Sequence, residues 1–556
     1  MSLLVSVAPW ALLGLLALLF WKLARNFILP SPLDKIPGPA SHSWTDGCMA
    51  DLTHREAWPF LEHLSNDYGQ VVQFPGRFGK RTLWVFDPKA LHHVIVKDQA
   101  SYDPLVTGRK LSTGPGLLAT LGDHHRRQRK LLNPVFSIAH MRRLMPVFSD
   151  VVNRLQRGMQ AQLKASHSNE VDVLNWMGRT ALELIGQGGF GHSFDALVEN
   201  TPNAYADAVK DFVPSISQLG VFRYMLLFAD PVVDLCAAWP ALGACFSAFF
   251  RRVPHAGARH MKNILDVLND TSVAIYEEKR AALASDDAET KMRVLEGRDL
   301  MSVMLRENMS ADAADRLPAV EIIAQLITFT FAGTDTTSNA LARILHLLCL
   351  YPDVQEKLRA EVLEARAQNG SAELDYDTLV GLPYLDAVCR ETLRLYPPVA
   401  FVNREATQDT VLPLSTPLAL RDGRTTDTLH IPKGTNILVG IWSSNRSTAL
   451  WGADAREWKP ARWLDGKLPE AVADAHIPGV YSNLMTFIGG GRACIGFKFS
   501  QLEMKVVLAM LVSSFRFSLC EGKNGEIVWN RAGIAYPSVG NSRRPSLPLC
   551  VEPLNG

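Results

Sequence analysis

A long, almost uninterrupted apolar stretch constrains the fold more than any other feature of this sequence. It opens at Pro318 and runs to about Leu350, and Pro352 stops it. Proline is favoured in the first turn of a helix. A helix that is apolar on nearly all sides is either deeply buried or membrane-spanning. Because a helix of this length extends over roughly 50 Å, the stretch predicts one long helix that crosses a whole domain.

A polar cluster interrupts the apolar stretch at its centre, where residues 333–339 read Gly-Thr-Asp-Thr-Thr-Ser-Asn. Hydroxyls and a carboxylate are costly to bury unless they are hydrogen-bonded. The cluster therefore argues against a membrane-spanning helix and indicates a functional site in a helix buried within the protein. The alternative is a helix break in which these side chains bond to their own backbone.

A glycine-dense segment around a single cysteine is the second unusual feature. Residues 487–496 read Phe-Ile-Gly-Gly-Gly-Arg-Ala-Cys-Ile-Gly, and a helical pattern follows from about Phe497 to Ser513. Glycines permit backbone turns closed to other residues and close approach to a flat ligand. At a helix N-terminus and near Arg492, Cys494 would favour its thiolate form. A shielded thiolate is what haem iron needs as a proximal ligand for dioxygen cleavage. The alternative is a plain structural turn.

Composition excludes several other classes of protein. The chain has 556 residues, of which 47% are hydrophobic and 20% are charged, and its formal net charge is +1. This is ordinary globular composition, and neither the net charge nor any basic run favours binding to nucleic acid. The eight cysteines form no Cys-x-x-Cys pair, so a zinc site or a redox dithiol has little support. Scattered cysteines suit a reducing compartment.

The N-terminus carries an apolar run without a charged side chain from Leu3 to Trp21. Its length is close to the roughly 20 residues that a membrane-spanning helix needs. Lys22 and Arg25 follow at once, and this charge order keeps the rest of the chain in the cytosol. A cleaved signal peptide would instead carry its positive charge before the apolar run. The run therefore predicts a membrane anchor.

A proline-rich connector follows the predicted anchor. Prolines at positions 30, 32, 37 and 39 predict a stiff, non-helical segment. We expect an anchor at residues 1–21, a hinge at 22–40 and one large domain at 41–556.

The segment around Cys494 resembles the haem-binding signature of the cytochrome P450 family, F-x-x-G-x-R-x-C-x-G. Its five fixed positions are matched by Phe487, Gly490, Arg492, Cys494 and Gly496. Other marks of the family follow in the expected places. They are residues 332–337 for the oxygen-activation motif, Glu391-Thr-Leu-Arg394 for E-x-x-R, Pro460-Ala-Arg462-Trp463 for P-x-R-F/W and Pro37-Gly38-Pro39 for the hinge. The resemblance covers essentially the whole chain and is closest to eukaryotic, fungal members of the microsomal type.

The chain departs from the family pattern at three places. Gly491 stands where many members have proline, and Ala461 replaces the glutamate of the P-E-R form. The W-x-x-x-R motif of the helix that contacts the haem propionates reads His125-Arg-Arg-Gln-Arg129 here. Histidine can still donate a hydrogen bond, as indole does, so this change affects the propionate contact and not the family.

The resemblance implies the cytochrome P450 fold, mainly α-helical with a small β-rich lobe, preceded by one N-terminal transmembrane helix. It implies haem b with the Cys494 thiolate as the axial ligand of the iron. Asp335 and Thr336 would be catalytic and would deliver protons during oxygen activation, beside the groove that Gly333 leaves in the long helix.

Further residues would hold the cofactor or the fold. Phe487 would pack beside the sulfur, with Gly490 and Gly496 shaping the loop. Guanidinium groups suit the haem propionates, and we expect four side chains there: His125, Arg129, Arg404 and Arg492. A structural triad would consist of Glu391, Arg394 and Arg462.

The activity implied is that of a monooxygenase of secondary metabolism, which uses O2 and electrons from NADPH. NADPH-cytochrome P450 reductase would be the separate electron donor and cytochrome b5 an optional second one, with a basic docking surface at Arg126, Arg127, Lys130 and Lys498. The protein would be a single-pass protein of the endoplasmic reticulum membrane with a cytosolic catalytic domain, and nucleic acid is not expected as a partner. Apolar residues such as Phe329 and Ala332 favour a lipophilic small-molecule substrate.

Two other activities stay open for a chain with these motifs. A haem-thiolate isomerase or dehydratase would rearrange a peroxide without O2 or a reductase, but such relatives tend to lack the acid–alcohol pair that Asp335 and Thr336 form. A membrane-anchored haem protein for binding or sensing would have no need of a proton relay.

Overall fold

The computed structural model describes residues 14, 17, 21, 24–166, 168–197, 203–217, 219, 232, 235–236, 239–285, 287–313, 315–370, 373–520 and 526–554. The chain forms two compact units. The first, here called the sheet unit, consists of residues 1–105, 399–456 and 469–493. The second, the helical unit, consists of residues 106–398, 457–468 and 494–556. Helices dominate and the sheets are small, so the mainly α-helical part of the predicted fold class, with its small β-rich portion, is confirmed.

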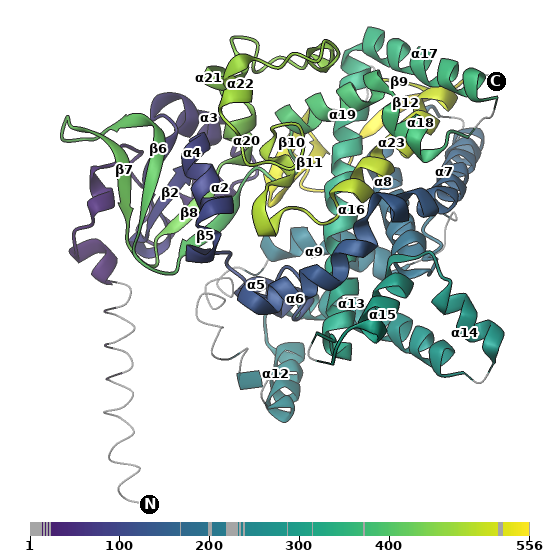
Figure 1. The fold of residues 1–556 in the computed structure, drawn as a ribbon, viewed down its shortest axis with the longest axis horizontal. Coiled ribbons are helices and arrows are strands. Elements are labelled where there is room, and N and C mark those ends of the chain that lie inside the picture. Colours follow the sequence, from purple (N-terminus) through teal and green to yellow (C-terminus); the bar gives the residue numbers. More distant parts are fainter. Residues whose placement is uncertain are drawn as a thin grey trace, which may run out of the picture. The chain divides into compact units, whose positions relative to one another are not determined.

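The sheet unit is built on a five-stranded sheet with the strand order β1-β2-β8-β5-β3. Its strands are β1 (Val71–Pro75), β2 (Arg81–Val85), β8 (Asn436–Val439), β5 (Val402–Ala406) and β3 (Tyr102–Asp103). A hairpin of β6 (Thr410–Ala419) and β7 (Thr425–Ile431) belongs to the same unit (Figure 1).

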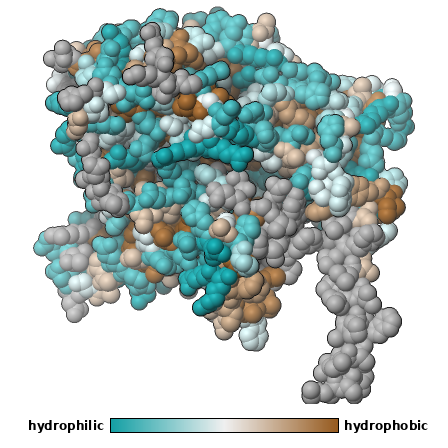
Figure 2. Space-filling model, turned by 180° about the vertical axis from the view of Figure 1, so that it is seen from behind, coloured by the Kyte–Doolittle hydropathy of each residue, from teal (hydrophilic) through white to brown (hydrophobic). Residues whose placement is uncertain are grey.

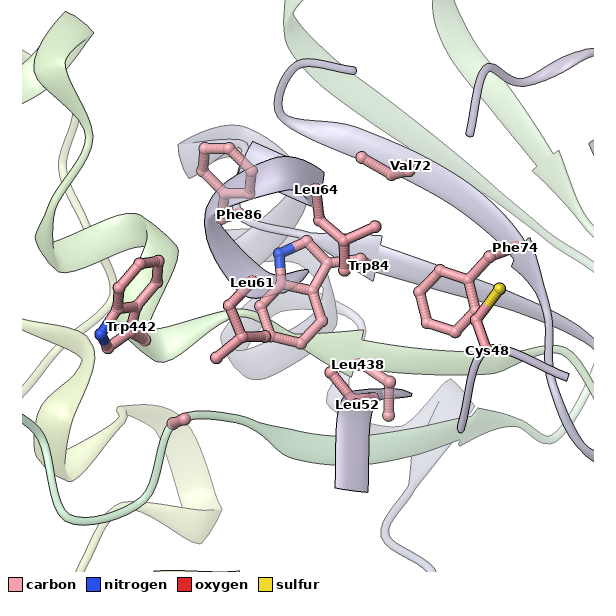
Figure 3. Packing of buried hydrophobic residues seen from close by; sticks show 11 residues of the cluster. Cys48, Leu52, Leu61, Leu64, Val72, Phe74, Trp84, Phe86, Leu438 and Trp442 are labelled. Atoms are coloured by element: carbon pink, nitrogen blue, oxygen red, sulfur yellow. The ribbon is translucent and has the colours of Figure 1, made fainter. Parts of the chain in front are cut away.

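The core of the sheet unit surrounds Trp84 on β2 (Figure 3). Leu61 and Leu64 come from α3 (Trp58–Asp67), and Trp442 comes from α20 (Ile441–Asn445). The indole N–H of Trp84 donates to Ser443 Oγ over 3.1 Å, so the largest buried side chain of this core has its polar atom satisfied.

The helical unit is organised around α16 (Ala319–Leu350), the predicted long helix, which has 32 residues and is preceded by Pro318 as N-cap. In Figure 1 it runs through the helical unit, and it packs against α8 (Val173–Leu184), α13 (Ala256–Ala284), α19 (Pro383–Leu395) and α23 (Phe497–Ser514). The polar cluster does not break α16. Three of its side chains bond to backbone carbonyls three or four residues earlier, so the helix stays continuous.

Further helices and two small sheets complete the helical unit. The sheets are β4-β12-β9 (Glu170–Asp172, Pro548–Pro553, Phe515–Ser518) and the hairpin β10-β11 (Ile527–Ala532, Ile534–Val539). The further helices of this unit include α6 (Gly122–Leu132), α7 (Ile138–Ser166), α9 (Ala204–Ser217), α12 (Pro240–Arg252), α15 (Leu300–Ser310), α17 (Pro352–Asn369) and α18 (Tyr376–Gly381).

The structure describes only part of the N-terminal segment for which an anchor and a connector were predicted. The predicted anchor falls on residues of which the structure describes 14, 17 and 21, and among all described residues no helix is long and apolar enough to cross a bilayer. The proline-rich connector was predicted to be non-helical, but Pro32–Lys35 forms a 3-10 turn that Ser31 caps. Leu33 and Ile36 are buried, so the connector packs into the sheet unit.

Candidate functional site

Cys494 lies just before α23, in the position that the sequence predicts. The backbone N–H groups of Gly496 and Phe497 donate to its sulfur, and both lower the pKa of the thiol. Burial has the larger, opposite effect, so that the pKa of Cys494 is raised overall. The free backbone donors at the start of a helix therefore hold the sulfur as predicted, but in a desolvated position.

The guanidinium that acts on the Cys494 thiol within the helical unit is that of Arg129 on α6. Its positive charge lowers the pKa of the thiol, and burial lowers the pKa of Arg129 itself. The sequence analysis gave the role at the sulfur to Arg492 and placed Arg129 at a propionate. Arg129 is thus near the sulfur in addition, and its Nε donates to Asn133 Oδ1 over 3.0 Å.

An accessible strip on α16 marks the middle of the long helix. Ala332 is exposed and Gly333, Asp335 and Thr336 are partly exposed, whereas the neighbouring Thr330 and Thr337 are almost completely buried. Cys494 also has an exposed surface, although the surrounding protein desolvates its thiol. Both segments therefore face open space inside protein surroundings, which is where a cofactor or substrate is accommodated.

Asp335 and Thr336 differ in what holds them. Burial raises the pKa of Asp335 to about 7, so that at neutral pH this carboxyl can both take up and release a proton. The Thr336 hydroxyl donates to the carbonyl oxygen of Ala332 over 2.7 Å, one turn earlier. The structure brings the acid and the alcohol together on the same stretch of accessible helix, as the sequence predicts.

Gly333 has room for a side chain as far as the protein is concerned. A Cβ built there would meet only Ile185, at 3.5 Å, which is an ordinary contact distance. The described neighbours therefore do not demand glycine at this position. What glycine provides is open space on the accessible strip, in agreement with the predicted groove.

The helices that carry Cys494 and Asp335 are joined directly. Thr337 Oγ1 on α16 lies 3.2 Å from Ser500 Oγ on α23. Phe499 on α23 packs edge-on against Phe148 of α7, with ring centroids 5.0 Å apart. These contacts fix the first turn of α23, and with it the backbone N–H groups that hold the sulfur.

The three residues of the predicted structural triad lie in contact with one another. The Arg394 guanidinium donates to both carboxylate oxygens of Glu391 over 2.8 and 2.9 Å, and Arg462 Nε reaches Glu391 over 3.4 Å. The backbone N–H of Lys459 and the indole N–H of Trp463 donate to the same carboxylate, each over 3.0 Å. Glu391 is thus a buried anchor with five donors, and it is far from exposed solvent.

In the sheet unit, two of the predicted propionate ligands lie near one carboxyl group. The positive charges of Arg492 and Arg404 both lower the pKa of Asp103, although burial raises it more. Arg404 on β5 is buried, and its Nη1 donates to the carbonyl oxygen of Asn403 over 2.8 Å. Two guanidiniums beside one carboxylate leave an excess of positive charge, which suits the acidic groups of a cofactor.

The loop that precedes Cys494 is shaped by one glycine that cannot be replaced. Gly490 has a φ of +63°, and a Cβ there would lie 2.0 Å from the carbonyl oxygen of Ile95. Phe487 is buried and packs edge-on against Tyr481, with ring centroids 5.8 Å apart. Gly496, in contrast, has nothing within 4 Å of a Cβ position, so no described contact explains glycine there.

His125 is buried on α6, one turn before Arg129. Its predicted contact with a propionate stays a prediction. The polar network on this helix centres on a different group, Glu321 at the start of α16. Gln128 Nε2 donates to Glu321 over 2.7 Å, and His124 lies 2.9 Å from it.

The sequence analysis missed a group of side chains on α9 and its neighbours. The Tyr205 hydroxyl lies 2.8 Å from Thr330 Oγ1, and its ring stacks on Phe194 with centroids 4.6 Å apart. Phe212 packs against Phe331 at 4.3 Å. No motif marks these residues, because single aromatic residues in amphipathic helices are common. Phe329, expected to line the pocket, is instead buried against Phe136.

The residues present in each unit fit haem. The helical unit offers one thiol held by two backbone N–H groups, and the accessible surface beside it. The sheet unit offers two guanidiniums near one carboxyl. Within the helical unit, a soft thiol donor with the Arg129 guanidinium acting on it is what haem with thiolate ligation requires. Within the sheet unit, guanidiniums suit the carboxylates of such a cofactor.

Comparisons with known proteins agree with this site. Residues 37–542 match the model of the family described as cytochrome P450. The chain is 49% identical over 542 residues to cytochrome P450 monooxygenase 91 of Postia placenta, covering 97% of each chain. It is 43% identical over 548 residues to a ganoderic acid synthetase of Ganoderma lucidum, again covering 97% of each chain. The chain therefore belongs to the cytochrome P450 family, as one of its fungal-type monooxygenases.

Proposed function

We propose that this protein inserts one oxygen atom of O2 into a lipophilic small organic molecule, with electrons that NADPH supplies through a separate reductase. When bound at Cys494, haem supplies the binding and reduction of dioxygen. The observation that supports the proposal most is the position of Asp335 and Thr336, a carboxyl with a pKa of about 7 beside a hydroxyl on the accessible strip of α16.

The two side chains have distinct tasks in this proposal. Burial raises the pKa of Asp335 to about 7, so at neutral pH the carboxyl can hold a proton and can also release it. The Thr336 hydroxyl donates its hydrogen to the carbonyl oxygen of Ala332, so its oxygen can accept a hydrogen bond from another group. Together they move protons inward along the helix, which an isomerase or a haem sensor would not need.

A lipophilic substrate is supported by the apolar surroundings of the strip. Ala332 is exposed, and Phe331 and Phe212 pack together on the neighbouring helix face. Aromatic and aliphatic walls with few polar groups are typical of sites for apolar ligands. One relative is named ganoderic acid synthetase, a name that gives the acid as its product, so a substrate panel would include lipophilic molecules that lack the acid group.

The membrane location is part of the proposal. The residues described on and next to α12 include the exposed Trp239, Phe246 and Phe249, and Figure 2 shows apolar side chains gathered on this helix. Exposed aromatic residues of this kind suit a bilayer surface. We propose a single-pass protein of the endoplasmic reticulum membrane, with the anchor at residues 1–21 and the rest of the chain in the cytosol.

The proposed reductase surface needs one revision. Of the four basic residues expected there, three already have acidic partners in the helical unit. Arg126 pairs with Asp123 at 2.9 Å, Arg127 with Glu321 at 3.6 Å and Lys130 with Asp315 at 2.9 Å. An acidic partner would have to compete with these ion pairs, so steering by this surface is weaker than the sequence suggests.

The proposal is tested by turnover with a reductase. The purified holoenzyme, NADPH-cytochrome P450 reductase and NADPH are combined with substrates selected by the shift of the haem spin state, and product, NADPH and hydrogen peroxide are measured. Thr336→Ala should keep haem and substrate binding but divert electrons to hydrogen peroxide. Thr328→Ala is the matched control, because this threonine makes the same bond to the backbone of α16, to Ala324 over 2.7 Å.

The outcomes separate the three activities. A monooxygenase forms oxygenated product at the expense of NADPH, and product per NADPH falls in Thr336→Ala alone. Product formed from a peroxide without NADPH would show an isomerase or dehydratase. Ligand binding without any turnover on the panel would favour a binding protein.

A further inference from the structure

Arg109 is a cation of the helical unit that the protein leaves short of a negative partner. It lies on α5 (Thr107–Thr113), a helix that packs against α16. Burial lowers the pKa of Arg109, and no carboxylate of the described residues counteracts this effect. A desolvated charge is stable only when the groups around it compensate it, so an anion that reaches this guanidinium would be stabilised there.

The guanidinium of Arg109 can be reached. Within the described part of the chain its side chain makes one hydrogen bond, a long one of 3.5 Å from Nη1 to the carbonyl oxygen of Leu118. Nε and Nη2 have no partner among these residues and are not fully buried, and Arg109 keeps part of its surface accessible. Nε and Nη2 form the side-on fork of a guanidinium, which pairs with both oxygens of a carboxylate.

The loop that Arg109 contacts has a fixed place on α16. The backbone N–H of Leu117 donates to Gln325 Oε1 over 3.0 Å. A Cβ at Gly116 would come within 2.4 Å of Thr328 Oγ1, so only glycine allows the loop to lie this close to the helix. These contacts hold Arg109 beside the turns of α16 that contain Gln325 and Thr328.

The face of α16 under this loop continues into the accessible strip. Residues four apart lie on one face of a helix, and Thr328, Ala332 and Thr336 follow one another at this spacing. From Thr328 to Thr336 the helix rises roughly 12 Å. A molecule with one end at Arg109 and the other at the strip therefore needs an elongated body.

Exposed apolar side chains accompany the cation. Leu111 on α5 and Leu118 after it are both exposed, and so is Ala332 on the strip. The carboxyl of Asp335, with a pKa of about 7, is partly protonated at neutral pH and provides no permanent negative charge, whereas arginine stays protonated. The molecule that fits these groups has an apolar body and one anionic end.

We propose that Arg109 recognises the substrate by an acidic group, and that the substrates are lipophilic carboxylic acids. The carboxylate lies on Nε and Nη2 of Arg109, and the apolar body extends along the face of α16 towards residues 332–336. The inference rests on the proposed function, to which it adds the chemical class of the substrate. A neutral molecule of the same shape would leave the guanidinium uncompensated and would bind less tightly.

The experiment compares dodecanoate, methyl dodecanoate and dodecan-1-ol, which share an apolar chain and differ in charge. Binding of each to the holoenzyme is measured by the shift of the haem spin state and by equilibrium dialysis, below the concentrations at which micelles form. Dodecanoate should bind about ten-fold more tightly than the ester or the alcohol, or more, because its hydrogen bonds to Arg109 are charge-assisted. No NADPH or reductase is present, so a failure of turnover would leave this result unchanged.

Variants assign the preference for the acid to Arg109. Arg109→Met removes the charge and should bind all three probes with similar affinity, with the affinity for the ester unchanged. Arg109→Lys keeps the charge without the fork and should retain part of the preference. Lys110→Met is the matched control, because it removes the same charge from the next residue of α5, and it should prefer the acid as the wild type does.

The haem content of each variant separates recognition of the substrate from a role at the cofactor. Normal haem loading is expected in all of them. If Arg109→Met is recovered without haem, the comparison is made with Arg109→Lys, and loss of haem from both would assign Arg109 to the cofactor and overturn the proposal.

Equal affinities of the wild type for the acid and the ester would also overturn it, as would an undiminished preference for the acid in Arg109→Met. A loss of preference in Lys110→Met equal to that in Arg109→Met would show a general effect of positive charge instead of recognition by one residue. Oxygenated product from neutral molecules, without any preference for the acid in binding, would leave the monooxygenase activity standing and contradict the acidic substrate class.

Discussion

Arg394 donates two hydrogen bonds of 2.8 and 2.9 Å to Glu391, and neither side chain has any exposed surface. A charge in such a position has no access to water, so it is compensated only by the protein groups that bond to it. The pair ties α19 to the segment around Trp463, which supplies a further donor to Glu391.

Glu391→Ala should therefore destabilise the protein strongly. Removing one partner of a buried pair costs about 3–5 kcal/mol, a large fraction of the stability of a typical domain. The yield of haem-loaded protein and the free energy of unfolding in urea measure the effect. Arg142→Ala is the control, because its pair with Asp377 is half-exposed and contributes about 0–1 kcal/mol; equal losses in the two variants would show that burial of Glu391 does not matter.

Glu503→Gln should stabilise the protein at neutral and alkaline pH. Glu503 on α23 is buried, neither carboxylate oxygen has a hydrogen-bond partner among the described residues, and burial raises its pKa well above the usual range. The folded protein then holds a proton that the unfolded chain has released. Stability of the wild type therefore falls as pH rises from the ordinary glutamate pKa through the raised one.

The measurement is the free energy of unfolding of both proteins between pH 4 and pH 9. The advantage of Glu503→Gln should be absent at the acid end and should grow by about 1.4 kcal/mol per pH unit through the window. Parallel pH profiles would show that the carboxyl is not held in its neutral form.

The pKa of Asp335 predicts how turnover depends on pH. Burial raises this pKa to about 7, so the protonated carboxyl is present below pH 7 and is lost above it. Product per NADPH of the wild type should therefore decline as pH rises above about 7. Asp335→Asn should lower turnover by about 10²-fold, the low end of what a positioned acid or base contributes. Its remaining activity should lack this decline, and an unchanged pH profile would remove Asp335 from the proton path.

Much of the site follows from local patterns, and the rest depends on tertiary packing. The position of Cys494 before a helix, the length of α16 and the contact of Glu391 with Arg394 follow from spacing within short segments. The contact of Glu391 with Arg462 was expected only from the family resemblance, because 71 residues separate the two. The effect of Arg129 on the pKa of Cys494 could not be predicted in this way, because Arg129 belongs to a helix more than 300 residues earlier in the chain. Glu503 was missed for the same reason, since only packing reveals a carboxyl without partners.

The sequence of the polar cluster in α16 is compatible with two local structures. A helix break satisfied by the backbone and a functional site in a continuous helix were both compatible with residues 333–339. The structure combines them, because Thr336 bonds to the backbone of Ala332 and yet lies on an accessible strip of unbroken helix. The strip is accessible while its neighbours Thr330 and Thr337 are buried, and which residues are buried depends on the whole fold.

The membrane topology that we propose predicts that no glycan is attached. Of four Asn-x-Ser/Thr sites, Asn445 is buried and Asn308 bonds to Leu317, whereas Asn369 and Asn269 are exposed. In the proposed topology Lys22 and Arg25 would keep these sites in the cytosol, where N-glycosylation does not occur. Expression in a eukaryotic cell followed by glycosidase should therefore leave the mobility unchanged. A sequon added before Leu3 is the positive control, and a shift that disappears in Asn369→Gln would reverse the topology.

The carbon monoxide spectrum of the reduced protein tests the central claim, that Cys494 ligates haem iron as a thiolate. The wild type should absorb at the wavelength typical of thiolate ligation. Cys494→His should bind haem without that band, because imidazole donates less negative charge to the iron. Cys349→Ala, which changes a buried cysteine at the end of α16, should keep the band. A spectrum of Cys494→His identical to that of the wild type would contradict the assignment of Cys494 as the ligand.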